Sequence, residues 1–110
     1  LGAVLADFDV LVCPTTAVPA FSAGESYVDT RLTVRGVELD HHLEACLTPV
    51  FNIASPCPVL AVPSGHASSG VPTGVQIVGR PYDESTVFRV GLAAEQCRPW
   101  AFEGDHLPRF

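Results

Sequence analysis

The alternation of apolar and polar positions along the chain predicts a sheet with helices beside it. Apolar runs at residues 9–13, 58–63 and 73–79 are short, rich in valine and bounded by proline or glycine. Such runs are typical of strands buried on both faces, as in a parallel sheet with helices on each side. We therefore expect an α/β fold in which three strands form part of a mixed sheet covered by helices.

Residues 27–34 follow a different pattern, because apolar and polar side chains alternate strictly there. This alternation predicts a half-exposed strand, and Arg35-Gly36 predicts a turn into a short return strand at residues 37–39. The preceding residues 14–26 contain two prolines, a glycine and several hydroxyl groups, and we expect them to form a loop. The pattern thus adds a β-hairpin insertion to the sheet.

Two segments have the period of an amphipathic helix. From Glu38 onward one stripe contains Leu39, His42, Leu43, Cys46 and Leu47, and Pro49 predicts that the helix ends or kinks at Thr48. Asp83 is a suitable N-cap for a second helix over residues 84–97, whose inner side would carry Val87, Val90, Gly91 and Ala94. We expect the remaining tail to be irregular.

The 110 residues read as a single segment, 1–110, with no internal boundary. Strands buried on both faces need more cover than two helices provide, so the segment is expected to be part of a larger domain. A net charge of −6 without a basic patch argues against nucleic acid and anionic membranes as partners. No apolar run reaches the roughly 18 residues that a membrane helix needs, so we expect a cytoplasmic location.

The cysteines and histidines suggest no cofactor. The four cysteines are irregularly spaced and mostly in apolar surroundings, which favours small buried thiols in a reducing compartment: Cys13, Cys46, Cys57 and Cys97. His41 and His42 with Glu44 and Cys46 could form half of a metal site. No second pair with ligand spacing occurs, so packing and solvent exposure of these histidines is the favoured interpretation.

Ser68 and Ser69, within "GHASSG", raise the possibility of a catalytic serine. A nucleophilic serine needs a base within hydrogen-bond reach and donors for the oxyanion. His66 is too close in sequence to act as that base, and neither serine has the flanking glycines of a G-x-S-x-G elbow. The composition of the segment instead predicts a turn between two strands.

Three other positions carry polar groups next to predicted elements. Asp7 and Asp9 flank the first strand, where solvation of the strand end is favoured over acid–base chemistry. Thr15 and Thr16 follow the carboxyl end of that strand, where ligands of open α/β sheets bind. Asn52 lies in the irregular segment after the first predicted helix. The threonines and Asn52 are the best candidates to line a cleft, with local hydrogen bonding as the alternative.

Several strings, in order, resemble the C-terminal part of the amidase signature family. They are "DVLVCPTTAVPAF", "LTPVFNIASPCPVLAVPSG" and "GVPTGVQIVGRPYDESTVFRVGLAAEQ", and together they cover nearly the whole chain. The resemblance implies an enzyme that hydrolyses a carboxamide C–N bond. It also implies a catalytic triad of a serine, a second serine on a cis peptide bond, and a lysine. Because this chain has no lysine, none of its residues is assigned a catalytic role, and the isolated segment is expected to be inactive.

The resemblance implies a substrate pocket bordered by Thr15, Thr16, Ala45, Thr48 and Asn52. It implies no metal or other cofactor, and its expected partners are a small amide substrate and the N-terminal part of the amidase domain. A homo-oligomer is also compatible with the sequence.

Two alternatives to a general amidase remain open. The string "DESTVFRV" is similar to a branch of the family, the A subunit of glutamyl-tRNA amidotransferase, in which an aspartate holds the amino group of the amide substrate. Ala45 occupies the corresponding position here, and an unpaired ammonium group would be costly to bury, so we favour a general amidase. Glu44 is an alternative partner for that ammonium group, although on a helix it would point in another direction. The second alternative is a non-catalytic binding or interaction module derived from the same fold.

Overall fold

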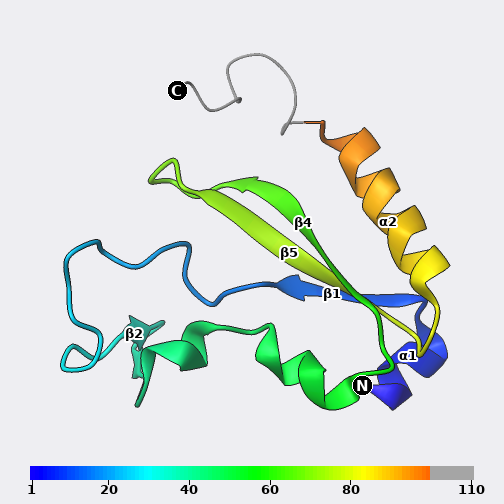
Figure 1. Cartoon of the computed structure of the whole chain (residues 1–110). Helices are drawn as coiled ribbons and strands as arrows, with labels where there is room; N and C mark the ends of the chain where they lie inside the picture. The colour runs from blue at the N-terminus through cyan, green and yellow to red at the C-terminus, as the bar shows by residue number, and fades with distance from the viewer. Residues whose placement is uncertain (100–110) are drawn as a thin grey trace.

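The computed structural model describes residues 1–99, which form an α/β arrangement around a three-stranded sheet (Figure 1). The strands of this sheet lie in the order β1-β5-β4, and β2 and β3 form a separate hairpin. In chain order the elements are α1 (Gly2–Asp7), β1 (Val10–Pro14), β2 (Thr33–Val34), β3 (Val37–Glu38), the 3₁₀ helices η1 (His42–Ala45) and η2 (Pro49–Ala54), β4 (Val59–His66), β5 (Pro72–Gly79) and α2 (Glu84–Cys97).

The β4–β5 hairpin is the centre of the fold. Leu60 pairs with Ile77, and the strands are joined by a turn at residues 67–71 in which the Ala67 N–H donates to the Val71 carbonyl over 2.9 Å. Gly70 has a φ of +82°, a conformation that glycine adopts without steric cost. The predicted turn at "HASSG" is confirmed, and the exposed serines lie at its tip.

The first strand forms at the predicted place, but its pairing is antiparallel and not of the parallel kind that its apolar run suggested. β1 pairs antiparallel with β5, with Val10 opposite Gly79, and both strand pairs of this sheet are antiparallel. The expectation of strands buried on both faces is also wrong for β1, because Val12 is 53% exposed. An apolar run does not reveal strand direction, whereas the short turn between β4 and β5 can only join antiparallel neighbours.

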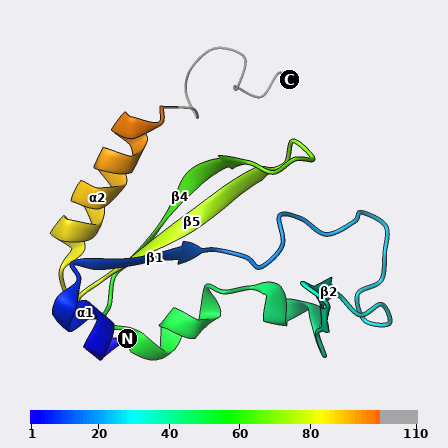
Figure 2. The ribbon, with the colours of Figure 1, turned by 180° about the vertical axis from the view of Figure 1, so that it is seen from behind.

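Helix α2 forms over the predicted residues and lies beside β4 and β5 (Figures 1 and 2), although Ala94, which was predicted on its inner side, is exposed. Asp83 caps it by accepting from the Thr86 N–H over 3.2 Å, and hydrogen bonds from the Thr86 side chain and backbone lower the pKa of Asp83. Gly91 is buried against β4, where an added Cβ would meet Leu60 Cδ2 at 2.6 Å. The glycine therefore allows the close approach of helix and sheet.

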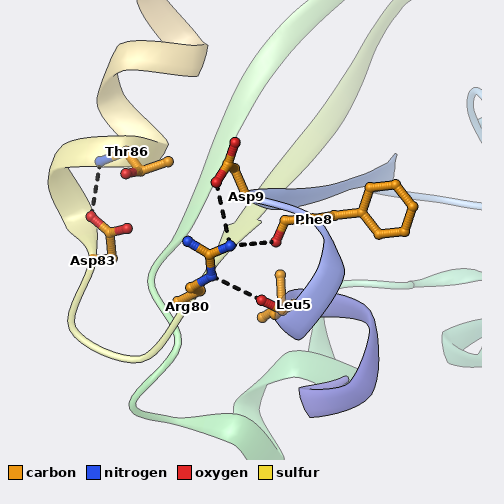
Figure 3. Close-up of polar contacts among 6 residues, drawn as sticks. All are labelled: Leu5, Phe8, Asp9, Arg80, Asp83 and Thr86. Carbon is orange, nitrogen blue, oxygen red and sulfur yellow. Dashed lines mark hydrogen bonds and ion pairs between the residues drawn. The ribbon is translucent and has the colours of Figure 1, made fainter.

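Helix α1 was not predicted from the sequence, and Arg80 attaches it to the sheet (Figure 3). The Arg80 Nε donates to the Leu5 carbonyl over 2.8 Å, and its Nη2 donates to the Phe8 carbonyl over 3.2 Å. The same Nη2 lies 3.3 Å from the Asp9 carboxylate. Because the carbonyls at a helix C-terminus carry partial negative charge, the guanidinium stabilises the end of α1 as well as its position.

Replacing Arg80 by lysine is expected to lower the free energy of unfolding by about 1 kcal/mol, because an ammonium group cannot reach both carbonyls with the fork geometry of arginine. Urea unfolding measures this difference. Arg89→Lys, at an exposed position of α2, is the matched control and should change stability little. Equal effects of the two substitutions would contradict the role given to Arg80.

The helix predicted from residue 38 is wrong. Only the four-residue η1 forms, and Cys46 is extended, with φ −86° and ψ 115°. The reason is tertiary, because this backbone pairs with the loop after β1: Thr16 bridges to Cys46, and the Leu47 N–H donates to the Thr15 carbonyl over 3.0 Å. Pro49 does not end a helix but begins η2, where its missing N–H costs nothing.

The strand predicted over residues 27–34 is wrong except at its end. β2 contains two residues, and the predicted turn at Arg35-Gly36 is confirmed, with φ values of 51° and 83°. Upstream, the Ser26 carbonyl accepts from the N–H groups of Asp29 and Thr30, so this segment turns instead of extending. Strict alternation therefore marked a real hairpin but overstated its length.

All four cysteines are free thiols, of which three are partly buried, while Cys97 is exposed, contrary to the expectation of burial. No helix within residues 1–99 is long and apolar enough to cross a membrane. The expected irregular tail, residues 100–110, lies outside the described residues.

Candidate substrate-binding site

The loop after β1 is held tightly to β5. Thr15 donates twice to the Gly74 carbonyl, from its N–H over 3.2 Å and from its Oγ1 over 3.1 Å. Thr16 is exposed, and its Oγ1 donates to the Val18 carbonyl over 2.7 Å. Both hydroxyl protons are therefore engaged with backbone carbonyls, and the oxygens keep lone pairs that can accept a hydrogen bond.

The segment containing Ala45 lies on the other side of the same loop. The Ala17 N–H donates to the Ala45 carbonyl over 2.7 Å, which continues the pairing at Leu47. Ala45 itself is completely buried, while the neighbouring Glu44 is exposed. The structure thus brings Thr15, Thr16 and Ala45 together, although they are about 30 residues apart in the sequence.

The other two predicted pocket residues lie further along this segment. Thr48 follows Leu47 directly and is exposed at the start of η2, and Asn52 is exposed within η2. Of the five predicted pocket residues only Thr16 lines the hollow described below, and Thr15, Ala45, Thr48 and Asn52 do not. The assignment of all five as substrate-binding residues stays a prediction.

A hollow of about 260 Å³ lies beside Thr16. Two of the polar side chains that line it were not singled out from the sequence: Ser64 on β4 and Thr73 on β5, whose hydroxyl oxygens are 3.0 Å apart. Regular hairpin pairing would not have found this pair, because Thr73 lies opposite Gly65 and Ser64 lies at an irregularity in the register between Pro63 and Gly65. The wall consists of Pro14, Thr16, Ala17, Val18, Pro19, Ser64, Thr73, Gly74 and Val75.

The arrangement has the chemistry to bind a small neutral polar group. Prolines, valines and alanine supply apolar surface, and hydroxyl oxygens supply acceptors. A carboxamide offers N–H donors that match such acceptors. No charged side chain lines the hollow within the part of the chain that the structure describes.

The remaining candidates for chemistry have structural roles. The rings of His41 and His42 stack with their centroids 4.3 Å apart, and the His41 Nδ1 accepts from the Leu43 N–H over 3.1 Å. Among residues 1–99 no group of three or more histidine, cysteine or acidic side chains could hold a metal ion. Asp9 is paired with Arg80, and Asp7 is exposed at the end of α1.

The family model for Amidase matches residues 1–88. This match covers most of the chain. The chain belongs to the amidase family.

Two curated relatives are each named as the A subunit of glutamyl-tRNA(Gln) amidotransferase. That of Brevibacillus brevis is 42% identical over 95 residues, which cover 86% of this chain and 18% of the relative. That of Thermosynechococcus vestitus is 40% identical over 92 residues, which cover 84% and 17%. The chain therefore spans less than a fifth of the length of these relatives.

Solved structures of the family have the same fold. A bacterial aryl acylamidase of the amidase signature family superposes with a TM-score of 0.72 at 30% identity, over 91% of this chain and 20% of that one. A protein from a vestigial complex, described in connection with the origins of an s-triazine catabolic enzyme, gives a TM-score of 0.69 at 30% identity, over 87% and 20%. The fold class predicted from the sequence is thus confirmed.

Proposed function

We propose that this chain is the C-terminal portion of an amidase that hydrolyses a carboxamide C–N bond to a carboxylic acid and ammonia or an amine. The observation that carries the proposal is the family match over residues 1–88, together with the small share of each relative that the chain covers. In this proposal the serine, the serine on a cis peptide bond and the lysine lie upstream. The absence of lysine from the chain is consistent with a catalytic lysine that lies upstream.

The role proposed for this portion is to form one wall of the substrate pocket. In the enzymes of the amidase signature family, a serine oxygen attacks the amide carbon and the amine leaves with a proton. Water then hydrolyses the acyl-enzyme. The loop of Thr15 and Thr16 contributes no group to these steps. It supplies acceptor oxygens and apolar surface that hold the amide in a fixed orientation, which is how positioning lowers a reaction barrier.

Ala45 favours a general amidase over a glutamine-dependent amidotransferase. It is fully buried and has no carboxylate to pair with the ammonium group of glutamine, and Glu44 beside it is exposed. A desolvated ammonium group without a partner is strongly unfavourable. The names of the relatives keep the A subunit of glutamyl-tRNA amidotransferase as the second candidate.

The test is hydrolysis by the protein at its native length, with 4-nitroacetanilide as the aryl amide and L-glutamine as the competing probe. We expect kcat/KM for the aryl amide to exceed that for glutamine by at least about 100-fold, because a polar group without its partner discriminates strongly. Higher activity with glutamine would support the amidotransferase. Absence of hydrolysis of either probe by the folded protein would support the binding module.

Ser68→Ala is the matched control for these assays. Ser68 lies in the exposed β4–β5 turn, so its removal is expected to leave the rate of aryl amide hydrolysis unchanged. A large loss of kcat in this variant would overturn the assignment of the segment as a turn without catalytic function.

A further inference from the structure

Gln76 is a buried polar side chain at the centre of the sheet. It is completely inaccessible to solvent and lies on β5 between Cys13 of β1 and Ala61 of β4. Its Nε2 donates to the Pro14 carbonyl over 3.0 Å. Its Oε1 is buried without a hydrogen-bond partner among residues 1–99. Of the two polar atoms of the side-chain amide, the Nε2 is thus hydrogen-bonded to the last residue of β1, and the Oε1 is not hydrogen-bonded to any described residue.

The packing of residues 1–99 alone does not explain a glutamine at this position. Burying an amide oxygen without a hydrogen bond is unfavourable, whereas an apolar side chain of similar volume avoids that cost. Methionine is unbranched and has nearly the length of glutamine, so it would fill the same space. The hydrogen bond to the Pro14 carbonyl is the contact that such an apolar side chain would lose.

That hydrogen bond fixes one peptide group from one side, and a second bond fixes it from the other. Gln76 holds the carbonyl of the Pro14–Thr15 peptide, and the Gly74 carbonyl accepts from the Thr15 N–H of the same peptide over 3.2 Å. Gly74 and Gln76 are two residues apart on one strand. Since a peptide group is planar, the two bonds together set its orientation and thereby the direction in which Thr15 and Thr16 continue.

We propose that Gln76 is a positioning residue for the substrate-binding loop, acting through the Pro14–Thr15 peptide. The proposal rests on the proposed function, because it assigns Thr15 and Thr16 to amide binding. Gln76 contacts no substrate. It holds the loop in the geometry in which the Thr16 oxygen and the neighbouring apolar wall receive the amide, so its loss reduces substrate affinity without removing a reacting group.

The first test is Gln76→Met in the protein at its native length. The matched control is Gln96→Met, at an exposed position of α2. We expect KM for 4-nitroacetanilide to rise about fivefold to tenfold, as for the loss of one hydrogen bond, with kcat changed less than about twofold. The thermal midpoint should stay the same or rise. Unchanged KM, or a fall in the thermal midpoint with proportionate loss of kcat, would show a structural role only and overturn the proposal.

A double-mutant cycle with Thr16→Val gives a second, independent readout. If Gln76 acts through the loop, its substitution should change KM much less in the Thr16→Val background than in the wild-type background. Additive effects would mean that Gln76 influences binding by another route, which contradicts the proposal.

Amide hydrogen exchange separates this proposal from the proposed function. In Gln76→Met the Thr15 N–H is expected to exchange about fivefold to tenfold faster than in the wild type, while amides in α2 are unchanged. If the wild type hydrolyses no amide, the proposed function fails, and faster exchange at Thr15 still supports positioning of the loop by Gln76. Unchanged exchange at Thr15 overturns that positioning whatever the activity.

Discussion

Replacing Ile77 by alanine is expected to lower the free energy of unfolding by about 3 to 4 kcal/mol, the range found when a large aliphatic side chain is truncated in a packed core. Ile77 is 1% exposed on the central strand β5 and is among the largest fully buried side chains of the described residues. Its neighbours across the sheet are Val12 of β1 and Leu60 of β4. The destabilisation has two parts. The removed methyl and methylene groups no longer contribute their free energy of burial, and the surrounding strands cannot close the cavity that remains.

Ile53→Ala is the matched control, because the same atoms are removed from a side chain that is 91% exposed in η2. It is expected to change the free energy of unfolding by no more than about 0.5 kcal/mol. Urea unfolding of both variants measures the difference. If the two substitutions destabilise the protein equally, the central strand is not where the core lies.

The second large effect is expected for Gly79→Ala. A Cβ at Gly79 would collide with Val87 Cγ2, would lie 3.2 Å from Pro58 Cγ, and would approach the Asp83 backbone oxygen to 3.3 Å. Val87 is 2% exposed and β-branched, so its side chain has little freedom to move away. We expect a loss of about 2 to 3 kcal/mol, typical of overpacking, as the start of α2 is pushed off the sheet.

Two other glycines give a graded comparison for this prediction. At Gly91 the added methyl group meets the end of the flexible Leu60 side chain, so Gly91→Ala should be less destabilising than Gly79→Ala. At Gly2 nothing lies within 4 Å, and Gly2→Ala in α1 should be neutral or slightly stabilising. Thermal unfolding of the three variants checks this order, and a different order would contradict the packing of α2 against the sheet.

The parts of the fold that the sequence predicted correctly are those determined by local interactions. The β4–β5 hairpin follows from two valine-rich runs and a short polar turn, and α2 follows from its cap at Asp83 and its apolar stripe. The turn at Arg35-Gly36 was correct for the same reason, since both residues adopt the positive φ that such a turn requires.

The incorrect predictions have a common cause in contacts between distant residues. The stripe from Leu39 to Leu47 has helical spacing, but its backbone pairs with residues 15–17 and cannot also complete an α-helix. Helix α1 depends on Arg80, which is about 70 residues away and gives no signal near the N-terminus. Direct pairing of β1 with β5 likewise depends on tertiary arrangement.

The candidate site was predictable only where a local pattern or the family resemblance indicated its residues. The position of Thr15 and Thr16 after a strand indicated a ligand-binding edge, and the family resemblance added Ala45. Gln76 was predicted on a buried strand, but its hydrogen bond to Pro14 joins residues 62 apart in the sequence. No local pattern contains that contact.

The intact mass of the native protein, measured by mass spectrometry of the species that carries these peptides, tests the central claim most directly. The relatives that the chain matches are more than five times as long as the matched segment, so we expect a species several times larger than 11.6 kDa. Such a species would have the additional chain length in which the proposed serines and lysine lie. A native species of 11.6 kDa would contradict the amidase proposal and would support a separate binding module built on the amidase fold.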